Sequence, residues 1–292
     1  MDLGDLLSIR YRPAHSKTRP ARRVSGLAGN RLSKLRGRGI DFSEVRAYQP
    51  GDDVRTIDWR VTARKNKPHT KVFREERERL TLVFVDQSQG MFFGSRARLK
   101  SVAAAEVAAT AAWQALAHND RVGGIVLGNR DAALHKPRRS VKNVARLLSD
   151  LATYNQALSP ATERADPENL RWALTRLRRL AHTGYRIFII SDFEPMGDHW
   201  RDALKGLSRH NEVVAVRIFD PLERDLPPPG RYTVTDTEQR WQFHSGNRLL
   251  RKTYRERFAD HEIELKTICE GSGVRYRSLA TDARVGPMAE WA

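Results

Sequence analysis

The sequence predicts an α/β protein in which a doubly wound, mostly parallel sheet follows a small β-rich block. The apolar run Leu80–Val85 leads directly into a polar, glycine-containing turn at Asp86–Gly90. A short apolar run of this kind is typical of a strand buried on both faces of a parallel sheet. A second such run, Ile187–Ile190, ends at Ser191 and Asp192. Because helical patterns separate these runs from further apolar segments, the alternation favours a doubly wound sheet.

The elements expected around these two strands follow from periodicity and from helix start signals. Leu99, Val102, Trp113 and Leu116 fit one face of an Ala-rich helix packed on a sheet. Pro167 suits the first turn of another helix. We expect helices at 99–116, 141–154, 167–181, 199–208 and 247–270, strands at 122–127, 213–219 and 274–279, a segment 131–135 paired with the first of these, and a hairpin formed by 231–235 and 240–244.

The chain before Leu80 differs in composition from the rest. We divide the sequence into a basic N-terminal arm at 1–38, a β-rich block at 39–79 and an α/β domain at 80–292 with a hairpin insertion at 221–246. The arm is polar, apart from a short helix expected near Asp2–Ile9. In the block, the spacing of Val54, Ile57, Trp59 and Val61 predicts short strands with one apolar face.

Composition restricts the location and the partners of the protein. The net charge is +17, and residues 1–79 contain 20 Lys and Arg against 10 Asp and Glu. Such a charge attracts nucleic acid, anionic lipid or an acidic protein, although a solvated basic surface is an equal alternative. A single cysteine, Cys269, excludes an internal disulfide. No apolar run approaches the roughly 18 residues of a membrane helix, and no apolar signal core is present, so we expect a cytoplasmic protein.

The polar residues at the two strand ends form the candidate site. If the strands are neighbours, then Asp86, Ser88, Ser191 and Asp192 converge at the edge where open α/β sheets bind ligands. The chain contains no P-loop, no Gly-x-Gly-x-x-Gly after a strand and no His-Glu-x-x-His, and the haloacid dehalogenase pattern would need an aspartate at Ser88. These absences argue against a P-loop, a dinucleotide site and a zinc site, and Ser88 rules out the haloacid dehalogenase pattern.

The arrangement resembles the metal-ion-dependent adhesion site of the von Willebrand factor A fold, which begins Asp-x-Ser-x-Ser. Asp86, Ser88 and Asp192 match three positions of that site, and oxygen ligands of this type would bind Mg²⁺. Gly90 stands in place of the second serine, and Glu168 and Asn169 stand where the threonine is expected. The resemblance therefore implies a degenerate metal site. Alternatively, Asp86 and Asp192 cap neighbouring helices and organise the loops.

A longer resemblance covers roughly residues 25–285. It rests on Gly39–Phe42, on Val45–Asp53 (VRAYQPGDD), on Arg55–Arg60 (RTIDWR) with Ala63-Arg64, and on the later Asp220–Glu223 and Leu279–Asp282. These segments are similar to domain-of-unknown-function family 58, bacterial proteins often encoded beside MoxR-type AAA+ ATPases. The family implies a von Willebrand A-like domain after the signature, with a MoxR-type ATPase and a client protein as partners.

The signature is unusually rich in charges next to aromatic residues. Exposed ion pairs contribute only ~0–1 kcal/mol each, so this density favours an interaction surface or a specific polar network over a stability device. The alternative is a solvated hairpin. The residues expected to dock a partner are Arg46, Tyr48, Asp52, Asp53, Arg55, Asp58, Trp59, Arg60 and Arg64. Within this set we expect Asp58 and Trp59 to be structural, and Arg46 and Arg64 to be partly exposed.

Three functional hypotheses follow. The leading one is a non-enzymatic, chaperone-like adaptor that works with a MoxR-type ATPase in the assembly or maturation of a client complex. The second is a metal-dependent hydrolase that uses Asp86 and Asp192. Neither aspartate has a His or Lys near it in sequence as a general base, so a residue distant in sequence would have to supply one. The third is a nonspecific nucleic-acid or polyanion binder, which rests on charge alone.

Overall fold

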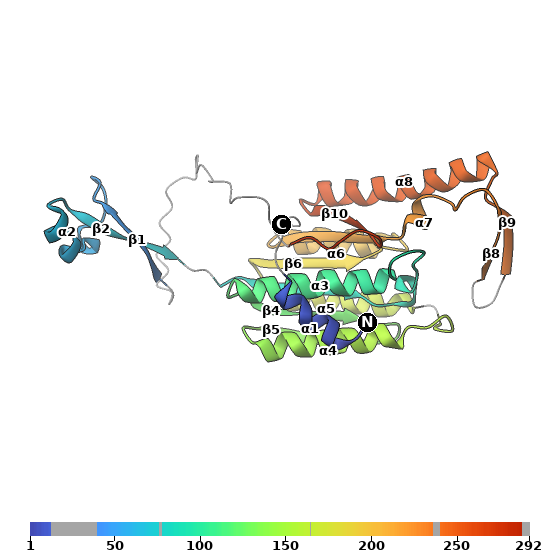
Figure 1. Cartoon of the computed structure of the whole chain (residues 1–292), viewed down its shortest axis with the longest axis horizontal. Helices are drawn as coiled ribbons and strands as arrows, with labels where there is room; N and C mark the ends of the chain where they lie inside the picture. Colours follow the sequence, from blue (N-terminus) through green and yellow to red (C-terminus); the bar gives the residue numbers. More distant parts are fainter. Residues whose placement is uncertain (13–39, 76–77, 164, 236–239, 288–292) are drawn as a thin grey trace. The chain divides into compact units, whose positions relative to one another are not determined.

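The computed structural model describes residues 1–12, 40–75, 78–163, 165–235 and 240–287 (Figure 1). These residues form two compact units. The larger one contains the described residues within 1–17 and 79–292, and the smaller one those within 18–78. The prediction for residues 13–38 lies outside the described part of the chain.

A mostly parallel sheet forms the centre of the larger unit. Its described strands are, in spatial order, β10 (Arg275–Ala280), β7 (Glu212–Phe219), β6 (Tyr185–Ser191), β3 (Leu80–Asp86), β4 (Arg121–Leu127) and β5 (Ala132–Arg138). All neighbours are parallel except β5, which pairs antiparallel with β4 at one edge. The prediction of an α/β protein with a mostly parallel sheet is therefore confirmed.

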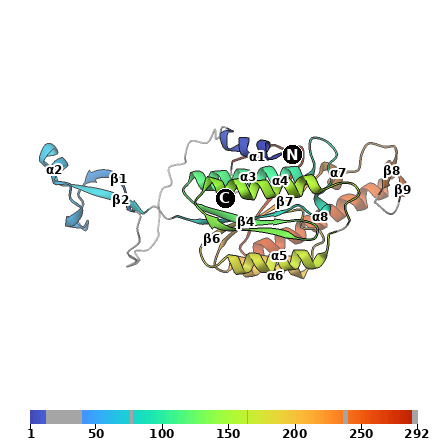
Figure 2. The same cartoon turned by 90° about the horizontal axis from the view of Figure 1, so that it is seen from below.

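Helices cover both faces of this sheet (Figure 2). One face carries α1 (Leu3–Ser8), α3 (Lys100–Ala117) and α4 (Val141–Ala157), and the other carries α5 (Pro167–Leu180), α6 (Asp198–Ser208) and α8 (Arg248–Gly271). Strand β3 supplies both cores, because Val83 and Val85 pack toward α3 while Leu82 and Phe84 pack toward α5 and α6. Burial of each such side chain contributes about 1.5–3 kcal/mol, which explains the continuous apolar run.

The helix boundaries follow local signals that the sequence contains. The side chains of Ser140, Asp166 and Asn247 accept hydrogen bonds from the first turns of α4, α5 and α8, and Pro167 occupies the start of α5. Short helical segments complete the unit: η1 (Ile9–Tyr11), η3 (Gln89–Met91) and α7 (Pro221–Arg224). In the part of the chain that the structure describes, we find no helix with the length and apolar character of a membrane span.

The helix expected near Asp2–Ile9 is present as α1, and it belongs to the larger unit. Leu6 is fully buried, and Trp113 Nε1 of α3 donates a hydrogen bond of 3.1 Å to the Leu6 carbonyl. The start of the predicted arm is therefore part of the packed domain. Further along, β8 (Arg231–Thr235) and β9 (Arg240–His244) form the expected hairpin.

The smaller unit differs from its prediction. Strands β1 (Ile40–Ala47) and β2 (His69–Glu75) pair antiparallel, but the segment between them is helical, with η2 (Val54–Thr56) and α2 (Trp59–Lys65). The short strands expected from Val54 to Val61 are therefore wrong. The Asp58 carboxylate accepts hydrogen bonds from the N–H groups of Arg60 and Val61, and this cap begins a helix where apolar alternation favours a strand.

Candidate functional site

Two neighbouring strands bring the predicted aspartates to the same edge of the sheet. Asp86 is the last residue of β3, and β6, which pairs with it, ends at Ser191. Ser191 Oγ donates to Asp86 Oδ2 at 2.8 Å, and the Ser88 N–H donates to Asp86 Oδ1 at 2.9 Å. Asp86 and Asp192 are 3% and 5% exposed. The expected convergence of Asp86, Ser88, Ser191 and Asp192 is thus present, but the two carboxylates are buried and not open to solvent.

The turn after β6 fixes the direction of Asp192. Phe193 adopts a left-handed backbone with φ of 61°, which is uncommon for an aromatic residue. Its N–H donates to Ser191 Oγ at 3.0 Å, and the Glu194 N–H donates to Asp192 Oδ1 at 3.0 Å. Phe193 is fully buried against Trp200, with ring centroids 4.7 Å apart. Packing and hydrogen bonds together hold this strained turn, and Asp192 with it.

A lysine that sequence reasoning missed lies between the carboxylates. Lys100, the first residue of α3, is 3% exposed. Its Nζ donates to Asp192 Oδ2 at 2.8 Å and to Glu223 Oε1 at 2.7 Å. Burial by itself would lower the pKa of this ammonium, but the charges of Asp192 and Glu223 outweigh burial and raise the pKa above its ordinary value. Lys100 is therefore a permanent cation within this edge.

The Asp220–Glu223 segment quoted in the family resemblance positions Glu223. The Asp220 N–H donates to Glu223 Oε2 at 2.7 Å, as part of a capping box at the start of α7. The Asp220 carboxylate in turn accepts from Thr281 Oγ1 at 2.6 Å and from the Ser95 N–H at 2.9 Å. The resembling segments 220–223 and 279–282 thus meet in one hydrogen-bonded network, which places an acidic side chain on Lys100.

Among the described residues no cation is paired with Asp86, and the pKa of its carboxyl group changes accordingly. Burial raises the pKa of Asp86 to about 6, and the negative charge of Asp192 acts in the same direction. The hydrogen bonds from Ser88 and Ser191 partly oppose this rise by stabilising the charged form. Near neutral pH the site therefore contains a carboxylate whose charged form is costly in this environment.

The residues at this edge do not fit a resident divalent cation. A Cβ added at Gly90 would lie 3.5 Å from Asp192 Oδ2, so position 90 faces the site but offers no hydroxyl. Asn169 uses its side-chain amide to bind the carbonyls of Gly128 and Asp131, and Glu168 is exposed. Among the described residues, no group of three or more His, Cys, Asp or Glu is arranged to hold a metal.

The hydrolase hypothesis gains no support from this geometry. A general base must reach the substrate or a water molecule, whereas Asp86 and Asp192 are buried and already accept hydrogen bonds. The Lys100 ammonium, which contacts Asp192, is already paired with two carboxylates. The arrangement fixes α3, β6 and α7 relative to one another instead.

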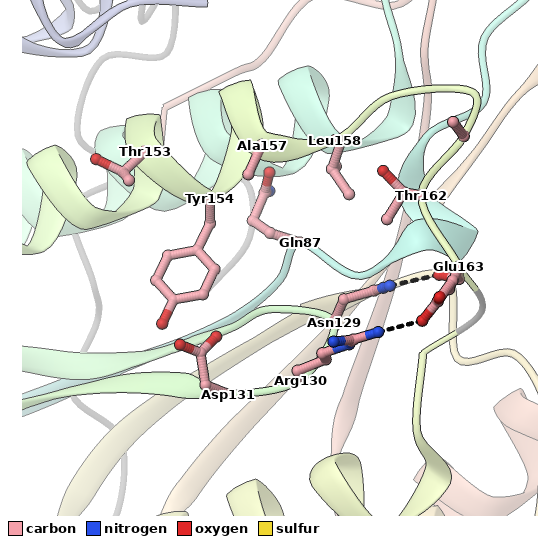
Figure 3. A pocket seen from close by; sticks show the side chains of 11 residues that line it. Gln87, Asn129, Arg130, Asp131, Thr153, Tyr154, Ala157, Leu158, Thr162 and Glu163 are labelled. Atoms are coloured by element: carbon pink, nitrogen blue, oxygen red, sulfur yellow. Dashed lines mark hydrogen bonds and ion pairs between the residues drawn. The ribbon is translucent and has the colours of Figure 1, made fainter.

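A cavity of about 590 Å³ lies at the same end of the unit, beside the β4–β5 turn and the end of α4 (Figure 3). Gln87, which follows Asp86, lines it and accepts a hydrogen bond of 3.0 Å from Asn155. Burial raises the pKa of Tyr154 to about 12, and the neighbouring Asp131 adds to the rise. The described residues that line the cavity include no His, Cys or Lys. Their mixture of apolar and hydrogen-bonding groups suits binding of a ligand or a partner side chain.

The signature residues of the smaller unit divide into a local polar network and an exposed group. Arg46 pairs with Asp52 at 2.7 Å, and a hydrogen bond from the Gln49 N–H, assisted by Arg46, lowers the pKa of Asp52. Hydrogen bonding by the Val61 N–H, together with the charge of Lys71, lowers the pKa of Asp58. Asp53 accepts from the Arg55 N–H and caps η2.

Trp59 is the clearest departure from expectation in this block. Its side chain is 69% exposed at the first position of α2, so the expected structural role of Trp59 is wrong. Arg55, Arg60 and Arg64 are also exposed, whereas Tyr48 is half-buried. Between described residues, these three arginines form no ion pair. Among its described side chains, the block thus presents an aromatic ring and several exposed cations to solvent.

Comparison with known proteins finds relatives whose sequences match most of the chain. A family model described as "Protein of unknown function DUF58" matches residues 44–264. Uncharacterized protein Rv1480 of Mycobacterium tuberculosis and uncharacterized protein Mb1516 of Mycobacterium bovis are each 31% identical over 258 residues, which is 88% of this chain and 79% of each relative.

Two solved structures show lower similarity. The conserved hypothetical protein BatB from Bacteroides thetaiotaomicron is 14% identical with a TM-score of 0.43, covering 73% of this chain and 93% of that one. An aerotolerance-related membrane protein from Bacteroides fragilis is 15% identical with a TM-score of 0.44, covering 70% and 92%.

Proposed function

Starting from the fact that the chain belongs to the DUF58 family, we propose that it is a non-enzymatic protein-interaction module. Its partners would be a MoxR-type AAA+ ATPase and a client protein whose assembly or maturation that ATPase assists. The partner assignment comes from the resemblance of the signature segments to proteins encoded beside such ATPases. The module would act in the cytoplasm, where the ATPase and its nucleotide are available.

The observation that carries the proposal is the exposure of Trp59. A tryptophan that is 69% exposed, next to exposed Arg60 and Arg64, has the composition of an interface hot spot rather than of a surface selected for solubility. Trp59 also lies in the Arg55–Arg60 segment, which is part of the signature that carries the family resemblance. Arg55, Arg60 and Arg64 would pair with acidic groups of the partner, and Arg46, Tyr48, Asp52, Asp53 and Asp58 would hold the surface in shape.

We assign the larger unit to the von Willebrand factor A type. A parallel sheet with β3 at its centre and an antiparallel strand at one edge supports this assignment, as does Asp-x-Ser at the end of β3. On this assignment the chain consists of the basic arm 1–38, whose first residues pack on the larger unit as α1, the signature block 39–79 and the domain 80–292 with its 221–246 insertion. Mg²⁺ has no role in the proposed function, because the edge that would hold it is closed.

Capture of the ATPase by variants tests the proposal. Trp59→Ala should weaken binding of a MoxR-type ATPase from the same organism by about thirtyfold, since truncation of a hot-spot tryptophan costs ~2 kcal/mol or more. The matched control is Trp172→Ala, which removes a tryptophan that is 43% exposed on α5. Undiminished binding by Trp59→Ala, measured by calorimetry on folded protein, would contradict the proposed docking surface.

Polyanion binding is the second candidate, favoured by the net charge of +17. It predicts weak, sequence-independent DNA binding whose affinity falls steeply with salt as counterions are released. The two candidates separate in one experiment, because Trp59→Ala would leave nonspecific DNA binding unchanged while it weakens ATPase capture.

A further inference from the structure

The cavity of about 590 Å³ beside the β4–β5 turn has the size of a site for a small ligand or a long side chain. Its lining comes from the residue after β3, from the β4–β5 turn, from the last turn of α4 and from the loop that follows α4 (Figure 3). Ala157, Leu158 and Ala161 give this lining an apolar part, and Tyr154 adds an aromatic ring. The cavity therefore offers contact to an aliphatic chain.

Hydrogen bonds and packing fix the acidic side of the cavity. The Gly128 N–H donates to the Asp131 carbonyl at 2.9 Å, and the Asn169 side-chain amide donates to the carbonyls of both residues at 3.0 Å. A Cβ added at Gly128 would lie 2.3 Å from the Tyr154 ring, so only glycine lets the ring pack on this turn. Tyr154 is hydrogen bonded to the Asp131 carboxylate, toward which Figure 3 shows its hydroxyl directed. This tyrosine and this aspartate are thus held in place without a ligand.

The charge of the lining is negative, in contrast to the charge of the chain. The lining contains one arginine and two carboxylates, whereas the whole chain has a net charge of +17. The arginine, Arg130, forms an ion pair with Glu163, and within the described residues no cation is paired with Asp131. A ligand that covers the Asp131 carboxylate has to compensate its charge, because burial of an unpaired charge is costly. An anion or a wholly apolar ligand does not compensate it.

The lining also distinguishes between kinds of cation. A metal ion needs several oxygen, nitrogen or sulfur ligands, and the described residues include no group of three or more His, Cys, Asp or Glu that could hold one. An organic cation needs one charged partner and apolar contacts. A carboxylate beside an aromatic ring suits such a cation, since the ring attracts positive charge as well.

We propose that this cavity binds an alkylguanidinium or alkylammonium group, whose charge pairs with Asp131 and whose aliphatic stem contacts Leu158 and Tyr154. The side chain of an arginine or lysine in a partner polypeptide and a free amine of the same chemistry both contain this group. The proposal goes beyond the proposed function, because the cavity belongs to the larger unit and not to the signature block.

The experiment uses the full-length protein with two cationic probes, butylguanidinium and a capped glycyl-arginyl-glycine peptide. The same peptide with citrulline in place of arginine has nearly the same shape and no charge. Binding is measured by ligand-detected NMR titration at low salt, where the net charge of +17 disfavours cations on the rest of the surface. The variants are Asp131→Asn, which removes the carboxylate, and Ala161→Trp, which adds a bulky side chain to the lining at an exposed loop position. Asp202→Asn on α6 is the matched control.

We expect the arginine peptide to bind the wild type with a Kd of about 1 mM, and the citrulline peptide to bind at least tenfold more weakly. Asp131→Asn and Ala161→Trp should each weaken binding of the arginine peptide about tenfold, while Asp202→Asn leaves it unchanged. Tighter binding of the peptide than of butylguanidinium would assign the cavity to a partner's side chain, and equal binding would assign it to a free amine. Both results support the proposal.

Equal affinity for the arginine and citrulline peptides would overturn the proposal, and this comparison on the wild type needs no variant to fold. Binding that Asp131→Asn leaves unchanged would also overturn it, as would the absence of binding at about 10 mM probe. The result is separate from that of ATPase capture by Trp59→Ala, which changes the signature block alone. Each proposal therefore fails or stands without the other.

Discussion

Replacement of Asp86 by asparagine should stabilise the protein at high pH and destabilise it slightly at low pH. The folded-state pKa of Asp86 is raised to about 6 from its ordinary value of 3.8, because the charged form is buried next to Asp192. A group of this kind contributes most to stability below pH 3.8, and this contribution is lost as the pH rises through about 6. The difference between the two pKa values corresponds to a loss of about 3 kcal/mol above pH 6.

The asparagine avoids that loss but forms weaker hydrogen bonds. Asp86 accepts from both Ser191 Oγ and the Ser88 N–H, and an amide has one oxygen for the two donors. If the poorer pairing costs about 1 kcal/mol, the variant is more stable than the wild type by about 2 kcal/mol at pH 8 and less stable by about 1 kcal/mol at pH 3.5.

Urea unfolding of both proteins between pH 3.5 and 8 measures this difference. All other titrating groups are shared, so the difference in unfolding free energy isolates position 86. Asp202→Asn, which removes an exposed carboxylate on α6, is the matched control. A variant that is less stable than the wild type by the same amount at every pH would refute the argument that burial penalises the Asp86 charge.

Three further predictions concern other positions. Lys100→Ala should lower the free energy of unfolding by about 3–5 kcal/mol at pH 7, because it strands two carboxylates, and a smaller loss at pH 4 in the same urea titration checks the cause. The Cys269 thiol, whose pKa burial raises to about 12, should not react with Ellman's reagent at pH 8 until guanidinium unfolds the protein. Asn247→Ala should cost about 1 kcal/mol in chemical denaturation through loss of the α8 cap.

Most of the larger unit could be predicted because its signals are local. The run at Leu80–Val85 is apolar on both faces, and both faces are indeed covered by helices. The helix starts at Pro167 and Asn247 follow from proline and capping rules that act within a single turn. Asp86 and Asp192 could be paired because carboxyl ends of neighbouring parallel strands share an edge.

The features that sequence analysis missed are of two kinds. Some join residues that are far apart in the sequence, and others arise where two local signals favour different secondary structures. Lys100 meets Asp192 and Glu223 across 92 and 123 residues, and its own neighbourhood shows only a lysine at the start of an alanine-rich helix. In the signature block, apolar alternation from Val54 to Val61 competes with the Asp58 cap, and the cap prevails. An aspartate three residues before Val61 was the signal that could have identified the helix.

Under the proposed function, a partner would bind at the signature block and not at the strand edge. At that edge Lys100 is buried and already paired with Asp192 and Glu223, so among the described residues it offers no free charge to a partner. The exposed arginines beside Trp59 offer such charge, since Arg60 and Arg64 form no ion pair between described residues. An acidic partner surface would therefore be drawn to α2, and charge reversal at Arg64 should weaken ATPase binding more than charge reversal at Lys205 on α6.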